Sequence, residues 1–82
     1  MPYTLNKINL FPNEILTEKL STANVHYFVL EGKCNMTTVY NDARMSLTVD
    51  TYRSYDISKD VYIEISNTFN EPCTLLEVTF EN

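Results

Sequence analysis

The sequence is dominated by short runs in which apolar and polar residues alternate one for one. In the run 45–50, Met45, Leu47 and Val49 alternate with polar neighbours, and a period of two is typical of a β-strand with one buried face. Valine, isoleucine, threonine, tyrosine and phenylalanine make up 31 of the 82 residues, whereas alanine occurs only twice. This composition favours strands, and no stretch keeps the spacing of an amphipathic helix. We therefore predict an all-β fold.

Short turns divide the chain into seven or so expected strands. Turns are expected at Pro12-Asn13 and Asn41-Asp42, and Gly32 closes the third strand. Because the chain has one glycine but nine asparagines, asparagine is expected to take some of the left-handed turn positions. The expected strands cover residues 7–11, 15–21, 25–30, 33–40, 45–49, 61–66 and 76–80. Strands at this spacing predict one sandwich or barrel domain over residues 1–82.

Charge, hydropathy and cysteine content narrow the class of protein. Six basic against eleven acidic residues give a net charge of −5, which argues against general nucleic-acid binding. No apolar run approaches the ~20 residues of a membrane span, and residues 1–6 lack the basic and apolar regions of a signal peptide. Cys34 and Cys73 are too few for a disulfide framework and are expected as small core residues. We therefore expect a cytoplasmic protein that does not bind membranes.

Residues that often carry chemistry are sparse. His26 is the only histidine, so it cannot form a histidine-rich metal site and is expected at a surface or an interface. A glycine-rich phosphate loop is impossible with one glycine, and no serine lies in a nucleophile elbow. Arg44 and Arg53 could bind a carboxylate or a phosphate, but plain surface charge is the simpler interpretation.

The segment that ends at Gly32 resembles the first motif of the cupin family, in which two histidines and a glutamate precede a glycine. Counted back from Gly32, the glutamate position falls on Val25 and the two histidine positions fall on Lys19 and Ser21. Cupins are small β-barrels of the jelly-roll type. The resemblance covers nearly the whole chain and implies a small single-domain cupin-like jelly-roll β-barrel, or double-stranded β-helix.

The second cupin motif also has a counterpart. When it is anchored on Asn67, its histidine position falls on Ile63. The closing run Leu75–Val78 is similar to the last strand of cupins of the sugar-phosphate isomerase and mannose-1-phosphate guanylyltransferase type. The four metal-ligand positions thus hold ammonium, hydroxyl and aliphatic side chains, which do not hold a divalent metal ion. The resemblance therefore implies a metal-free cupin without a cofactor, in which Gly32 and Asn67 keep their motif identities.

On the inferred register, the mouth of the barrel is lined by Lys19, Ser21, Tyr27, Met36 and Ile63. This mostly apolar lining, with one cation and two hydroxyls, favours a small polar or anionic organic ligand such as a sugar, an acid or a nucleotide. Such a ligand would be bound without catalysis. The alternative is that these side chains only fill the barrel.

The last strand bears on the same site. Leu76, Val78 and Phe80 alternate with polar residues that include Glu77, so we expect the apolar phase to face inward and no carboxylate to lie there. A buried lysine needs a partner or access to solvent. Lys19 is therefore predicted to anchor an anionic or polyhydroxyl ligand.

Other apolar residues are expected on the outside of the barrel. Leu16, Leu20, Phe28 and Leu30 are expected to point outward, with His26 beside them. A contiguous exposed apolar area indicates a partner, and the resemblance implies dimerisation, because cupins commonly form homodimers through such sheet faces. These five residues are the predicted homodimer interface.

Two alternatives from other classes stay open. The first is a metal-independent sugar-nucleotide isomerase or lyase in which Tyr27, Lys19 or His26 acts as acid or base, as the resemblance to some metal-free cupins implies. The second is a small interaction or sequestering protein, of viral or host origin, that acts on a nucleotide signal or on a protein partner. An inward-facing acid–base pair conserved in relatives would favour the first alternative, and a ligand that copurifies in the mouth would favour the second or the simple ligand binder.

Overall fold

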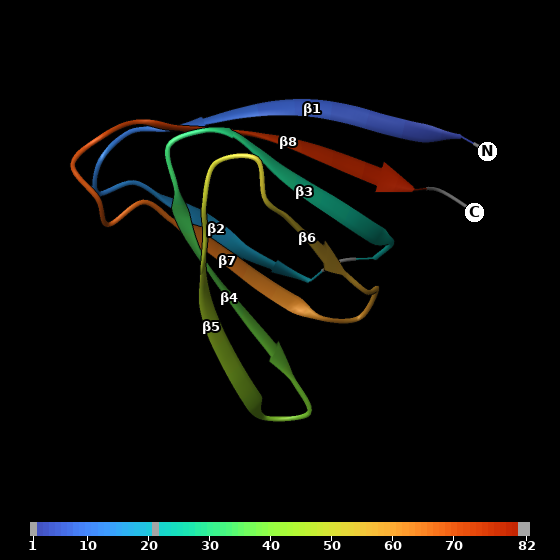
Figure 1. The fold of residues 1–82 in the computed structure, drawn as a ribbon. Helices are drawn as coiled ribbons and strands as arrows, with labels where there is room; N and C mark the ends of the chain where they lie inside the picture. The colour runs from blue at the N-terminus through green and yellow to red at the C-terminus, as the bar shows by residue number, and fades with distance from the viewer. Residues whose placement is uncertain (1, 21, 81–82) are drawn as a thin grey trace.

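The protein is built of strands and turns (Figure 1). The computed structural model describes residues 2–20 and 22–80, apart from the side chains of residues 17–19. Two four-stranded antiparallel sheets, ordered β1-β8-β3-β6 and β2-β7-β4-β5, face one another, and the predicted all-β fold is confirmed. Within the described ranges, no helix is long and apolar enough to cross a membrane. The strands are β1 (Tyr3–Leu10), β2 (Ile15–Leu20), β3 (Asn24–Glu31), β4 (Cys34–Tyr40), β5 (Ala43–Val49), β6 (Ser54–Ile57), β7 (Tyr62–Ser66) and β8 (Cys73–Phe80).

One strand, β6, was not expected. It has only four residues and lies at the edge of its sheet, paired with β3. A run this short holds two apolar residues, Tyr55 and Ile57, which is too little alternation to stand out from a loop. β1 also begins earlier than expected, at Tyr3, because its first residues pair with the end of β8.

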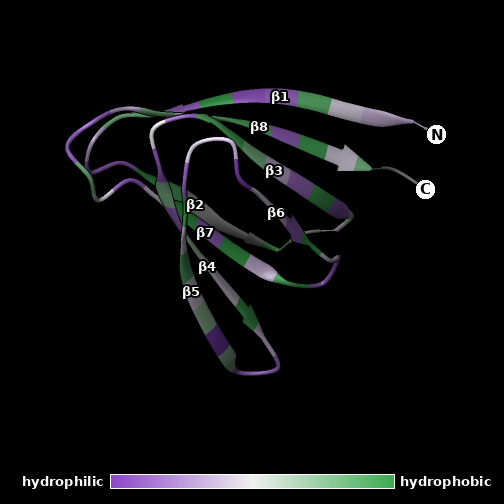
Figure 2. Ribbon diagram, viewed as in Figure 1, coloured by the Kyte–Doolittle hydropathy of each residue, from purple (hydrophilic) through white to green (hydrophobic). Residues whose placement is uncertain are grey.

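Hydrophobic and hydrophilic residues alternate along the strands (Figure 2). This alternation decides which side chains meet between the two sheets. In β3, Val25, Tyr27 and Val29 are buried, whereas the intervening His26 and Phe28 are partly exposed on the outer face. Burial of such side chains is the main favourable contribution to folding. The buried apolar residues are Leu10, Val25, Tyr27, Val29, Cys34, Met36, Val49, Ile57, Ile63, Ile65, Cys73 and Leu75.

The facing of β8 differs from the predicted one. Leu75 lies opposite Val29 and Glu77 lies opposite Tyr27, so both face inward, next to buried partners. Glu77 is only 7% exposed, and the expectation that no carboxylate faces inward is therefore wrong. Because Leu75 and Leu76 are both apolar, the sequence pattern permits either phase, and a shift of one residue turns every side chain to the other face.

Leu16 faces the core and not the solvent, because β2 contains a β-bulge. The pairing of β2 with β7 shifts register between Leu16 and Lys19, and an extra residue in one strand reverses the alternation beyond it. Leu16 lies opposite Ile65 and packs against the core, whereas Leu20 lies opposite Tyr62 and is 45% exposed. The prediction that Leu16 faces outward with Leu20 is therefore wrong.

Asn67 closes the end of the sandwich at which β1 and β7 finish. Its side-chain Nδ2 donates to the carbonyl oxygens of Leu10 (3.0 Å) and Glu71 (2.8 Å), and its Oδ1 accepts from the Phe69 N–H (3.0 Å). Its backbone makes two further hydrogen bonds, of 2.7 and 3.0 Å, with the turn at residues 13–14. The fully buried amide therefore joins the β1–β2 turn to the loop between β7 and β8.

Gly32 lies at the same end, in the turn between β3 and β4. Its φ is +75°, in the left-handed region that glycine enters without steric cost. A Cβ at this position would lie 2.4 Å from the carbonyl oxygen of Pro72, so this close approach requires a glycine. Asn13 and Asn41 also have positive φ values, of 70° and 49°, which confirms the predicted use of asparagine in turns.

We predict that Asn67→Ala lowers the free energy of unfolding by about 2–4 kcal/mol, because it leaves buried backbone groups without hydrogen-bond partners. Urea unfolding followed by circular dichroism measures this change. Asn70→Ala is the matched control, since Asn70 is an exposed residue of the same loop, and it should change stability by no more than about 0.5 kcal/mol. Equal effects of the two substitutions would show that the buried amide is not a structural tie.

Candidate functional site

The positions that the cupin resemblance assigns to metal ligands do not form a metal site. Val25 and Ile63 are buried aliphatic side chains, with exposures of 6% and 3%. The backbone of Lys19 pairs with Ile63, whereas the Lys19 side chain and the whole of Ser21 lie outside the described residues. In the described part of the chain, no three histidine, cysteine or carboxylate side chains gather to hold a metal ion. Because aliphatic side chains supply no donor atoms, Val25 and Ile63 do not fit the metal ion that the cupin resemblance would place there.

A cavity of about 290 Å³ lies between the sheets, at the end of the sandwich opposite Asn67. Its lining differs from the predicted one. Tyr27 and Met36 are 0% exposed, and together with Ile63 they belong to the packed core rather than to the cavity wall. The cavity is near the lower size limit of small-molecule sites. It is lined by Thr38, Tyr40, Met45, Tyr55, Asp56, Ile57, Ser58 and Val61.

The core contains a polar pair that sequence alternation did not predict. The phenol of Tyr27 donates a hydrogen bond of 2.7 Å to Oε2 of Glu77, across the neighbouring strands β3 and β8. Burial raises the pKa of Tyr27, and the hydrogen bond and charge of Glu77 raise it further. Tyr27 is therefore a neutral donor at neutral pH, and its hydrogen bond offsets part of the cost of burying the carboxyl group of Glu77.

We predict that Tyr27→Phe removes a pH-dependent part of the stability. Because the pKa of Tyr27 is raised in the folded protein, the phenol contributes stability below pH 10.0, its ordinary pKa, and loses it as the pH rises above that value. Above pH 10.0, the unfolding free energy of the wild type should therefore fall more steeply with pH than that of Tyr27→Phe, by about 1.4 kcal/mol per pH unit.

Urea unfolding from about pH 8 to about pH 11 measures this difference in slope. Tyr52→Phe is the control, because Tyr52 is 74% exposed and should leave the slope unchanged. Parallel pH profiles for the wild type and Tyr27→Phe would contradict the assignment.

His26 lies on the outer face of the β1-β8-β3-β6 sheet, where its Nδ1 pairs with Oδ1 of Asp56 on β6. Tyr27, the next residue along β3, faces the core. The two side chains therefore lie on opposite faces of one sheet, so they do not form an acid–base pair in a common cavity. This geometry gives no support to an acid–base mechanism that pairs His26 with Tyr27.

Cys34 and Cys73 are fully buried free thiols, as predicted. They come from opposite sheets, on β4 and β8. The hydrogen bond with Cys73, and then burial, raise the pKa of Cys34. Since the thiolate is the reactive form of cysteine, Cys34 is a core residue rather than a nucleophile.

The outer face of the β1-β8-β3-β6 sheet carries a group of apolar side chains that we call the apolar face. Three of the predicted interface residues, His26, Phe28 and Leu30, lie on this sheet, whereas Leu16 and Leu20 belong to the other one. The sequence pattern did not predict the residues from β1 and β8, because it placed Leu76 and its neighbours inside. The apolar face consists of Leu5, Phe28, Leu76, Val78 and Phe80, whereas Leu30 lies at a register shift of β3 that leaves it without a partner on β8.

Comparisons with known proteins agree on the fold. The sequence matches no protein-family model and no curated protein. The structure of Drosophila melanogaster CENP-C bound to CAL1 superposes with a TM-score of 0.87 at 14% identity, over 93% of this chain and 63% of that one. Vicilin from hazelnut, Corylus avellana, gives 0.88 at 17% identity, over 94% and 22%. An oxalate oxidase in complex with the substrate analogue glycolate gives 0.86 at 11% identity, over 93% and 40%.

The architecture and these superpositions together define the class: the chain has the jelly-roll fold of the cupin superfamily. It spans 63% or less of the length of the matched CENP-C chains. The matched structures include an oxidase with a substrate analogue and a cupin-domain protein bound to a protein partner. The fold alone therefore does not decide between a small-molecule site and a protein-binding surface.

Proposed function

We propose that this protein is a cupin-fold binding module and that its apolar face binds a second copy of the chain. The supporting observation is where the face lies. Phe28, Leu76 and Val78 project outward from β3 and β8, the two central strands of their sheet. Contiguous apolar side chains on the outside of a small protein favour a protein contact. CENP-C bound to CAL1 is an example of a protein with this fold and a protein partner.

Charge favours a second copy as the partner. The chain has a net charge of −5, so two copies repel one another unless their contact avoids carboxylates. In the rows of outward residues that cross the sheet through Val78 and Leu76, the only carboxylate is Asp56, and it is paired with His26. An acidic chain with such an acid-poor apolar face meets this condition.

The size of the face fits a weak dimer. Three strands of eight residues and one of four, about 4.8 Å apart at about 3.3 Å per residue, present about 440 Å². Two copies packed face to face would bury about 900 Å², which is below the size of a stable specific interface and is typical of a transient contact. A two-fold axis through the face gives an isologous contact, the commonest arrangement in soluble homo-oligomers. We therefore expect a reversible dimer.

We predict that Phe28→Glu converts the dimer into a monomer, because the two-fold axis brings two new carboxylates into an apolar contact. Light scattering should report about twice the chain mass of 9.5 kDa for the wild type and about 9.5 kDa for the variant. Tyr62→Glu is the matched control, since Tyr62 is 48% exposed and lies on β7, in the other sheet.

Two outcomes would contradict the proposal. A wild-type protein that stays monomeric as its concentration rises would show that the apolar face does not bind a second copy. A Phe28→Glu variant that keeps the dimer mass would show that the interface lies elsewhere. Loss of the dimer in Tyr62→Glu as well would mean that added charge alone separates the copies.

We further propose that the protein is cytoplasmic. Cys34 and Cys73 come from opposite sheets and are both free thiols. Free thiols in contact persist in a reducing compartment and tend to oxidise in a secretory one.

A second candidate function is the binding of a small polar or anionic organic ligand at the mouth cavity. It is favoured by the hydroxyl groups of Thr38, Tyr40, Tyr55 and Ser58, which line the cavity of about 290 Å³. Such groups bind a sugar, an acid or a nucleotide fragment by hydrogen bonds. In this proposal Lys19 and Ser21 meet the charged or hydroxyl groups of the ligand, while Tyr27, Met36 and Ile63 support the site from the core.

Native mass spectrometry of the purified protein tests this candidate. We expect a mass increment from a copurified small molecule, and Lys19→Met should weaken its binding by about tenfold or more, because a charge-assisted hydrogen bond is lost. Lys33→Met is the control, since the Lys33 ammonium lies over the ring of Phe69 at the end of the sandwich opposite the mouth. An unmodified mass, or equal affinity in Lys19→Met, would contradict ligand binding at the mouth.

A further inference from the structure

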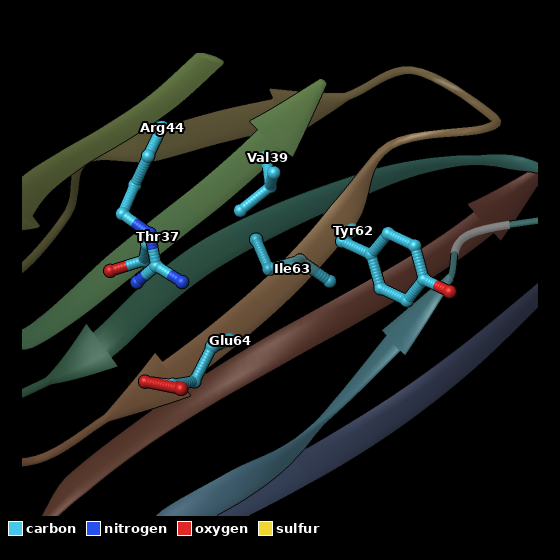
Figure 3. A pocket seen from close by; sticks show the side chains of 6 residues that line it. All are labelled: Thr37, Val39, Arg44, Tyr62, Ile63 and Glu64. Atoms are coloured by element: carbon cyan, nitrogen blue, oxygen red, sulfur yellow. The ribbon is translucent and has the colours of Figure 1, made fainter. Parts of the chain in front are cut away.

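A second cleft lies on the outer face of the β2-β7-β4-β5 sheet (Figure 3), away from both the mouth and the apolar face. Its volume is about 290 Å³. Two neighbouring rows of side chains form it, because Val39 lies opposite both Arg44 and Tyr62, and Thr37 lies opposite Glu64. We propose that this cleft is a saccharide-binding site that holds the ring of a neutral sugar.

The polar groups of the cleft match the hydroxyls of a sugar. The Arg44 guanidinium donates hydrogen bonds and the Glu64 carboxylate accepts them, while the Thr37 hydroxyl already shares a hydrogen bond of 2.9 Å with the Ser46 hydroxyl and keeps capacity for one further partner. Within the described part of the chain, neither Arg44 nor Glu64 makes a side-chain hydrogen bond or ion pair. Both are therefore available to a ligand whose adjacent hydroxyls are each donor and acceptor.

The charges of the cleft argue against an ionic ligand. One guanidinium and one carboxylate line the same space. An anion that pairs with Arg44 is therefore repelled by Glu64, and a cation that pairs with Glu64 is repelled by Arg44. A neutral ligand avoids this conflict, and hydrogen bonds to charged groups are stronger than those between neutral groups. The two opposite charges thus favour an uncharged ligand with hydroxyl groups over a ligand with a net charge.

The apolar part of the cleft completes the match. Val39 lies between Arg44 and the ring of Tyr62 in Figure 3, and Tyr62 is 48% exposed, whereas the Ile63 side chain is buried in the core. A pyranose ring has a face of C–H groups as well as its hydroxyls, and an exposed aromatic ring beside an aliphatic side chain offers apolar surface to that face. The cleft is near the lower size limit of ligand sites, which fits one sugar unit.

The test is a titration of ¹⁵N-labelled protein with the methyl glycosides of glucose, galactose and mannose and with N-acetylglucosamine, followed by amide chemical shifts. We expect at least one of them to shift the amides of Val39, Arg44 and Glu64 with a millimolar dissociation constant, as befits a ligand of about twelve non-hydrogen atoms. Arg44→Met should weaken binding by about tenfold. Arg53→Met is the matched control, because Arg53 is the only other arginine and lies between β5 and β6.

Three results would overturn the proposal: no glycoside shifts these amides, the shifts map to other strands, or Arg44→Met binds as tightly as the wild type. Free leucine is included as a zwitterion, and binding of leucine without any glycoside would also overturn it in favour of an amino-acid site. Arg44 is exposed, and the amide spectrum itself reports whether each variant is folded. The cleft and the proposed dimer face lie on different sheets, so each proposal can fail without the other.

Discussion

The buried amide of Asn67 is the interaction on which the relation of the two sheets depends. It joins the end of β1, in one sheet, to the loop that follows β7, in the other. An amide has both donors and an acceptor, so one side chain satisfies three backbone groups, of Leu10, Phe69 and Glu71, at buried and partly buried positions. Gly32 allows a second close approach at the same end, against Pro72. The cavity at the mouth and the turn of the β4–β5 hairpin lie at the opposite end (Figure 1).

The interior of this cupin fold is packed, so the surfaces proposed for binding lie on the outer faces of its two sheets. In the place where the cupin resemblance expects metal ligands, Val25 and Ile63 fill space, and the nearby polar pair, Tyr27 with Glu77, is satisfied internally. A satisfied buried pair gives shape and specificity to a core rather than a reactive group. The outer faces differ from one another: one sheet presents the apolar face, and the other presents a cleft with mixed charge.

Sequence alternation predicted the strands well where one face is apolar and the other polar, as in β4 and β7, and the motif spacing matched Gly32 and Asn67 to the turn and the buried amide that close one end of the fold. It failed at three places for physical reasons. β6 is too short to show a period, the bulge in β2 reverses the phase after Leu16, and β8 is apolar at two consecutive residues. The last failure hid the partner of Tyr27 and most of the apolar face, since both depend on which phase of β8 turns inward.

The pairing of β1 with β8 also limits the order in which the fold can form. Tyr3 lies opposite Phe80, and β8 separates β1 from β3, so β1 has no sheet to join until β8 is in place. The β4–β5 hairpin, by contrast, closes over a two-residue turn and can form while the rest of the chain is still unfolded. Folding slows as contacts become more distant in sequence. The first strand of the sheet therefore docks last, and until then the edge of β8 is open to strands from other molecules.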